Sequence, residues 1–126
     1  MMRNERSDEH HKIQRAVVKF ARDACHTYPE LHGLYAIPNG GKRDVVTAAK
    51  LKTEGVLAGV WDLHLPVPCG GFHGLWIEIK YGDDKLSKEQ EKWGEYVRLY
   101  GHATCIAYTA QEAIDFLIEY INGRCQ

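Results

Sequence analysis

Two acidic side chains and a lysine lie in two short apolar segments near the middle of the chain. In WDLHL the polar residue Asp62 alternates with apolar neighbours, and in LWIEIK Glu78 and Lys80 do the same. Such alternation is typical of β-strands, whose successive side chains point to opposite faces. A hairpin centred near Gly70 would place Asp62 directly across from Glu78, with Lys80 on the same side.

This arrangement predicts a metal site that hydrolyses phosphodiesters. Two carboxylates so close together repel each other unless a cation lies between them, and oxygen ligands favour hard divalent ions such as Mg2+ or Mn2+. A neighbouring lysine can orient the attacking water or stabilise negative charge in the transition state. The alternative is an exposed strand face carrying solvating charges, because E-x-K by itself occurs by chance in most proteins.

The elements that must hold these residues follow from apolar periodicity and capping signals. The sequence predicts an α/β fold in the order helix, strand, helix, strand, strand, helix, strand, helix, with a mixed sheet covered by helices. Trp61 is expected on the same strand face as Leu63 and Leu65, opposite Asp62. The expected helices cover about residues 8–26, 43–54, 87–100 and a segment after the capping box of Thr109 and Glu112; the expected strands cover residues 34–37, 61–65, 75–80 and 103–108.

The first predicted helix carries a further acidic residue on its buried side. Glu9 lies four residues before Ile13, which begins an apolar stripe at helical spacing. A carboxylate at the end of such a stripe needs a partner or a metal ion. Glu9 is therefore a possible additional ligand.

Length, net charge and cysteine content narrow the classes of protein to which the chain can belong. The 126 residues fit one domain, residues 1–126, with residues 1–7 expected to fray. The net charge of −1 counts against a passive DNA-coating protein, which is normally basic. The N-terminus is polar and no apolar run is long enough to span a bilayer, so a cytoplasmic location is expected. The four cysteines form no CxxC pair, which favours reduced thiols over disulfides or zinc.

Four segments in matching order resemble the VRR-NUC family of the PD-(D/E)XK nuclease superfamily, in its stand-alone phage and bacterial type. The likeness covers about Glu9 to Tyr108 and implies a restriction-endonuclease-like core. The segments are IPNGG, AAKLKTEGVLAGVWDLHLP, GLWIEIK and LSKEQEKW.

The resemblance also implies roles for single residues. Asp62 matches the family's aspartate, Glu78 its second acidic residue and Lys80 its lysine. Asp62 and Glu78 would bind the metal ion, with the backbone carbonyl of Ile79 as an extra ligand. Trp61 stands where the family usually has proline, and because that proline shapes the backbone, the departure leaves the chemistry intact.

Two further matches are open to more than one interpretation. Glu9 resembles the family's first-helix glutamate and a metal ligand, although Asp8 or His10 could be the aligned residue. Gln90 resembles a catalytic glutamine of the helix that follows the catalytic strand. It also completes an S-x-x-Q capping box with Ser87, and both roles can hold together.

A glycine-rich loop precedes the second predicted helix. Helix N-termini offer backbone N–H groups to phosphate, and two basic residues follow the glycines directly. Beside a nuclease site, DNA binding by this loop is favoured over a simple turn. The residues concerned are Asn39, Gly40, Gly41, Lys42 and Arg43.

The expected function is Mg2+- or Mn2+-dependent hydrolysis of DNA by an endonuclease. Similarity of the stand-alone members to Holliday-junction resolvases implies branched DNA as substrate, a homodimer and a role in DNA repair. The alternatives are a DNA-binding module without catalysis, or a subunit of a repair or replication assembly that retains the nuclease fold.

Overall fold

A mixed sheet of four strands forms the centre of the protein, in the order β1-β2-β3-β4. The computed structural model describes residues 2–39 and 44–124, with side chains from residue 8 onward. The first three strands are antiparallel neighbours, and β4 runs parallel to β3. The elements are α1 (Met2–Ala24), the 3-10 helix η1 (Pro29–Gly33), β1 (Tyr35–Ala36), α2 (Val45–Thr53), β2 (Leu63–Leu65), β3 (Leu75–Ile79), α3 (Lys88–Leu99), β4 (Ala103–Ala107) and α4 (Ala110–Ile121).

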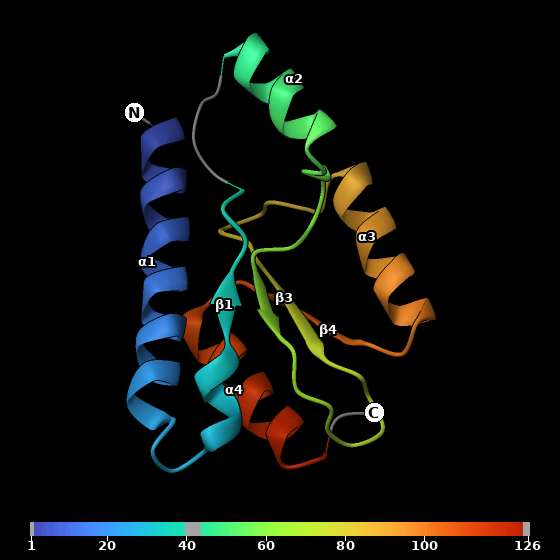
Figure 1. Cartoon of the computed structure of the whole chain (residues 1–126). Coiled ribbons are helices and arrows are strands. Elements are labelled where there is room, and N and C mark those ends of the chain that lie inside the picture. Colours follow the sequence, from blue (N-terminus) through green and yellow to red (C-terminus); the bar gives the residue numbers. More distant parts are fainter. Residues whose placement is uncertain (1, 40–43, 125–126) are drawn as a thin grey trace.

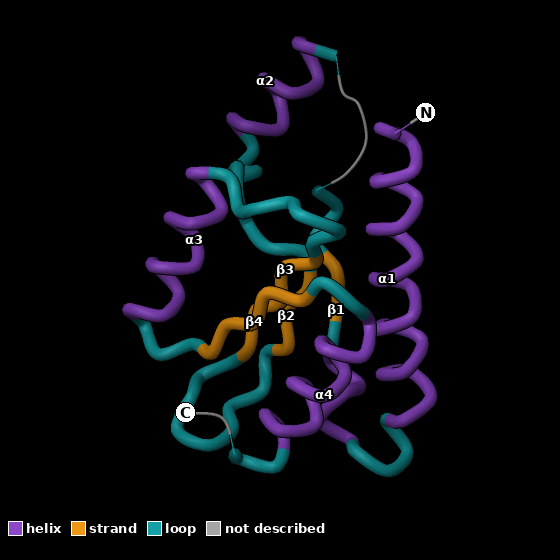
Figure 2. Tube along the Cα trace, turned by 180° about the vertical axis from the view of Figure 1, so that it is seen from behind, coloured by secondary structure: helices purple, strands orange, loops and turns teal. Residues whose placement is uncertain are grey.

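The helices cover both faces of this sheet. Helices α1 and α4 lie together against one face, and α3 lies against the other (Figure 1). The larger apolar core, which includes Val17, Ile77 and Leu117, fills the space between the sheet and the α1–α4 pair. A smaller core of Trp61, Trp76 and Val97 lies on the α3 side. Figure 2 shows α2 apart from these layers, beyond one end of the sheet.

The predicted hairpin register is confirmed. Strands β2 and β3 pair Leu63 with Ile77 and Leu65 with Leu75, so each pair is centred on position 70. Continued by one residue, this register aligns Asp62 with Glu78. The turn itself contains Gly70 with φ at +57°, a backbone conformation that glycine adopts without strain.

Trp61 is a correction to the prediction. It does not share a face with Leu63 and Leu65, because β2 begins only at Leu63 and the indole packs in the core on the α3 side. Two features explain this position. The indole N–H donates to the backbone carbonyl of Gln90 at 2.9 Å, and Gly94 leaves space where a side chain would collide with the ring.

The ends of the helices differ in detail from the prediction. Helix α1 begins at Met2, not Asp8, because no proline or glycine interrupts the polar residues before Asp8. Thr109 caps α4 as expected, but Glu112 accepts from the backbone N–H of Tyr108 and not from that of the cap residue. Within the described residues, no helix combines the length and apolar character needed to cross a membrane.

Candidate active site

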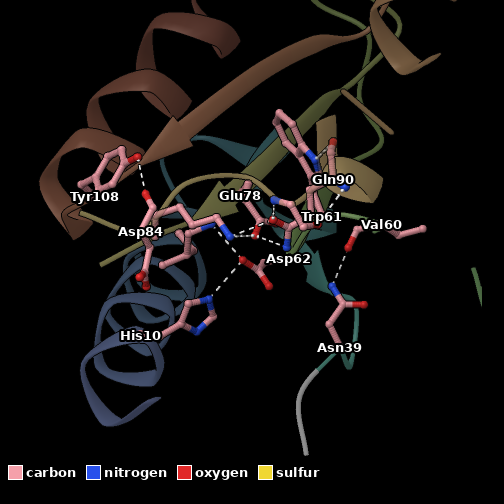
Figure 3. Close-up of polar contacts among 12 residues, drawn as sticks. His10, Asn39, Val60, Trp61, Asp62, Glu78, Asp84, Gln90 and Tyr108 are labelled. Atoms are coloured by element: carbon pink, nitrogen blue, oxygen red, sulfur yellow. Dashed lines mark hydrogen bonds and ion pairs between the residues drawn. The ribbon is translucent and has the colours of Figure 1, made fainter. Parts of the chain in front are cut away.

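Asp62 lies directly before β2, where the chain enters the sheet, and its side chain is 9% exposed. Its Oδ2 accepts a hydrogen bond from the backbone N–H of Ile79 at 2.8 Å. The same oxygen lies 3.2 Å from Nε2 of His10 on α1. Strand β3 and helix α1 therefore hold one carboxylate oxygen from two directions, as Figure 3 shows.

Glu78 is the most deeply buried charged residue among those described, at 2% exposure. Its Oε2 accepts from Nε2 of Gln90 at 2.9 Å, whereas Oε1 is buried with no hydrogen-bond partner. Burial, followed by the negative charge of Asp62, raises the pKa of the Glu78 carboxyl to about 7. The nearby ammonium group of Lys80 and the His10 ring lower this pKa and so oppose the increase only in part.

Lys80 and Gln90 complete the polar cluster. Nζ of Lys80 donates to Oε1 of Gln90 at 2.8 Å and lies 3.3 Å from Oε2 of Glu78. Gln90 occupies the first turn of α3, and its side chain contacts both Lys80 and Glu78. Ser87 caps this helix, and the Gln90 side chain returns to the Ser87 backbone N–H at 2.9 Å in a full capping box.

The capping role predicted for Gln90 is confirmed, and its contacts with Lys80 and Glu78 are compatible with the catalytic role, which stays a prediction. The amide oxygen of Gln90 accepts from the backbone N–H of Ser87 and from Lys80, and the amide nitrogen donates to Glu78. The amide is therefore fixed in orientation by three partners. It can hold the lysine and the acidic group in a defined relation.

Helix α1 contributes His10 to this cluster. Glu9 forms an ion pair with Lys12 at 3.2 Å, while the ring of His10 is turned toward Asp62. The hydrogen bond to Asp62 is the main cause that raises the pKa of His10, partly opposed by burial. The apolar stripe of α1 passes through both positions, so spacing alone could not decide between Glu9 and His10.

The acidic pair fits a divalent cation in part. Glu78 offers a buried oxygen without a partner, and Asp62 is near enough to raise the pKa of Glu78. Among the described residues, however, no three side chains of His, Cys, Asp or Glu form a ready metal cluster. Asp62 and Glu78 are therefore the residues that would hold an ion, and the assignments of Glu9 and the Ile79 carbonyl as ligands stay predictions.

A groove of about 930 Å³ reaches Asp62 from the α2 side. Lys52 of α2 and Glu89 and Gln90 of α3 line it, together with the loop of residues 55–60. Gly59 brings this loop against α3: a Cβ at Gly59 would lie 2.5 Å from the backbone of Glu89. The carboxylate at the base of the groove is accessible to a ligand although most of its surface is buried.

The predicted phosphate-binding loop is described only at its first residue. Gly40, Gly41, Lys42 and Arg43 lie outside the described residues. Asn39 lines the groove, and its side-chain amide donates to the carbonyl of Val60 at 2.6 Å. This bond ties the start of the loop to the segment that leads into Asp62, and contact of Asn39 with DNA stays a prediction.

Comparison with solved structures identifies the fold. A protein described as a VRR_NUC domain protein superposes with a TM-score of 0.74, over 94% of this chain and 96% of the other. The chain has the VRR-NUC fold. The sequence identity is 23%, and neither a protein-family model nor a curated protein matches the chain.

The match confirms the fold predicted from the four sequence segments. In this VRR-NUC fold, Asp62, Glu78, Lys80 and Gln90 lie in one polar cluster at a single end of the sheet. Sequence reasoning did not anticipate the Ile79 N–H as a donor to Asp62 or the indole of Trp61 as an anchor for α3. Neither carries a sequence signal, because both depend on how the chain turns before β2.

Proposed function

We propose that the protein is a metal-dependent deoxyribonuclease whose active site contains Asp62, Glu78 and Lys80. The observation that carries the proposal is a buried pair of carboxylates beside a lysine, in which Asp62 also lines an open groove. Burying charge costs folding free energy, and perturbed carboxylates in clefts are typical of catalytic sites. The VRR-NUC fold of the chain is consistent with this function.

Asp62 and Glu78 would hold Mg2+ or Mn2+, and the ion would supply Lewis-acid activation of the scissile phosphate and of water. The remaining task belongs to the protein. Lys80 is held by Gln90 with its ammonium group beside Glu78, where it can orient a water molecule or stabilise added negative charge on a phosphate. This role requires a fixed ammonium position, which the 2.8 Å bond provides.

DNA is the proposed substrate, entering by the groove beside α2. Lys50 and Lys52 belong to the last turn of α2, and Lys52 lines the groove. Positive charge along the path to the acidic pair would bind the phosphate backbone without reading sequence. Endonuclease action on branched DNA, in DNA repair, is the specific form that we propose.

We further propose a homodimer, which would present two active sites to the two strands of a branched substrate. Tyr96 and Leu99 of α3 and its C-cap residue Tyr100 are exposed, and Leu99 is 76% exposed. Large apolar side chains exposed at neighbouring positions favour burial against a second copy. Sedimentation of the wild type and of Leu99→Glu tests this, because only the substitution should give a monomer.

The deciding experiment offers Holliday junctions, flaps, splayed arms and plain duplex to the full chain with Mg2+ or Mn2+. We expect cleavage of at least one branched species by the wild type and its loss in Lys80→Ala. Lys52→Ala is the matched control, since it removes a groove lysine outside the acidic cluster and should weaken DNA binding more than turnover. Equal cleavage by Lys80→Ala would contradict the proposal.

The same experiment separates an enzyme from a DNA-binding module without catalysis. Asp62→Asn should abolish cleavage and leave DNA binding measurable, because the substitution removes a charge that binds metal and not one that binds phosphate. Binding of DNA without cleavage by the wild type, under every metal condition, would favour the module or the assembly subunit.

A further inference from the structure

The position of His10 bears on which metal ion the site accepts. Its Nε2 lies 3.2 Å from Oδ2 of Asp62, and its side chain is 30% exposed. Glu9, the acidic neighbour, is engaged with Lys12. The first helix therefore directs a nitrogen donor, and not a carboxylate, at the acidic pair.

The distance between these two atoms fits a shared ion as well as a hydrogen bond. Two donors on adjacent corners of an octahedron, each about 2.1–2.2 Å from the ion, lie about 3 Å apart. The 3.2 Å separation of the two atoms is close to that value. His10 could thus share an ion with Asp62, although the side chains would have to draw closer together, because His10, Asp62 and Glu78 do not form a ready metal cluster as they stand.

Charge and ligand type then predict a preference among ions. Mg2+ is bound mainly through carboxylates and water, whereas an imidazole nitrogen suits transition-metal ions such as Mn2+ better. A site of Asp62, Glu78 and His10 carries one negative charge fewer than a site with a third carboxylate. Lys80, at 3.3 Å from Glu78, offsets part of what remains. Both factors weaken Mg2+ binding more than Mn2+ binding.

We propose that His10 is a metal ligand of this site and makes it select Mn2+ over Mg2+. The inference rests on the proposed function in one respect, namely that Asp62 and Glu78 bind a divalent ion. It does not require that the bound ion cleaves DNA. The competing explanation is that His10 only positions Asp62 through a hydrogen bond. It predicts that no nitrogen binds the metal ion.

The test measures ion binding to the chelator-treated full chain, without DNA. Calorimetry gives the Kd for Mn2+ and for Mg2+ in the wild type, His10→Ala and His10→Glu, with His32→Ala as the control for an exposed histidine. We expect Mn2+ to bind the wild type about tenfold or more tightly than Mg2+, and this ratio to fall about tenfold in His10→Glu. His32→Ala should match the wild type.

Pulsed electron paramagnetic resonance of bound Mn2+ provides the direct readout. A coupling to a ligand nitrogen should be present in the wild type and in His32→Ala, and absent from both His10 variants. Absence of that coupling in the wild type, or its persistence in His10→Glu, overturns the proposal. His10→Glu also guards against a loss of structure in the alanine variant, because glutamate keeps a long polar side chain at this position and favours helices.

The two proposals can fail separately. Mn2+ binding with a His10-dependent nitrogen coupling, but without cleavage of any DNA, would support His10 as ligand and contradict the nuclease. If DNA cleavage depends on Lys80 but bound Mn2+ shows no nitrogen coupling, the nuclease is supported and His10 as a ligand is contradicted. Failure of the wild type to bind either ion, with Asp62→Asn as reference, would overturn both.

Discussion

Lys80 donates to the side-chain oxygen of Gln90 at 2.8 Å, and that same oxygen accepts from the backbone N–H at the start of α3. The proposed catalytic lysine is therefore attached to a helix cap. A change at the cap residue and a change at Gln90 should damage the helix to a similar degree but affect the lysine differently.

Gln90→Ala should lower the rate of DNA cleavage about 10- to 100-fold, because Lys80 and Glu78 lose the amide that orients them. Ser87→Ala is the matched control, since it removes the cap oxygen that accepts from the Gln90 N–H and leaves the amide contacts in place. Both should lose about 1 kcal/mol of stability in urea unfolding. Equal loss of activity in the two variants would show that Gln90 acts only as a cap.

Glu78→Gln should raise the melting temperature of the protein at pH 8 in EDTA. The folded-state pKa of about 7 lies above the ordinary value of 4.5, because of burial and then the charge of Asp62. Stability from this group is thus full below about pH 4.5 and is lost as the pH rises through about 7. The gain should therefore shrink at pH 5, and added Mn2+ should stabilise the wild type more than the variant. Glu95→Gln, an exposed change in the middle of α3, should alter neither melting curve.

His64→Phe should make the protein less sensitive to acid. Burial, with a smaller effect of His102, lowers the pKa of His64 from 6.5 to about 4 in the folded state. Between these two values His64 is protonated in the unfolded chain but neutral in the folded protein. The free energy of unfolding therefore decreases as the pH falls from about 6.5 toward 4. Phenylalanine preserves the ring stacked on Trp76 at 3.9 Å and cannot titrate. Melting temperatures between pH 7.5 and 4.5 should fall less steeply in His64→Phe, whereas the exposed substitution His32→Gln should keep the wild-type slope.

Gly94→Ala should destabilise the protein although alanine favours helices. A Cβ at this position would lie 2.7 Å from Cζ2 of Trp61, whose ring is fully buried. Overpacking costs about 1–3 kcal/mol, which exceeds the gain of about 1 kcal/mol from helix propensity. Urea unfolding measures the difference. Gly33→Ala is the control, because the nearest atom to its added Cβ is Pro66 at 3.8 Å, and an unchanged midpoint in Gly94→Ala would show that α3 can shift.

The order of the helices and strands and the register of the hairpin could be predicted because both depend on local patterns. Alternation fixed the faces of β3, and the spacing of the two strands about Gly70 fixed which residues pair. The alignment of Asp62 with Glu78 follows from these two features. Capping residues likewise placed the starts of α3 and α4 within a residue or two.

The remaining features depend on contacts between distant segments. The direction of Trp61 follows from space at Gly94 and from an acceptor on Gln90, more than 25 positions along the chain. The choice of His10 over Glu9 is a matter of how far α1 is rotated against the sheet, which apolar spacing leaves open by one residue. The tie from Asn39 to Val60 has no sequence pattern at all.

Helix α2 has no buried residue, and Val45 and Val46 are 85% and 79% exposed. Its amide hydrogens should accordingly exchange with solvent far sooner than those of β3, because opening α2 uncovers none of the apolar core. The part of the groove that α2 forms can therefore open without disturbing the acidic residues. The residues of α2 can therefore be substituted, or the helix lengthened, to change what the groove admits while the acidic cluster stays folded and unchanged.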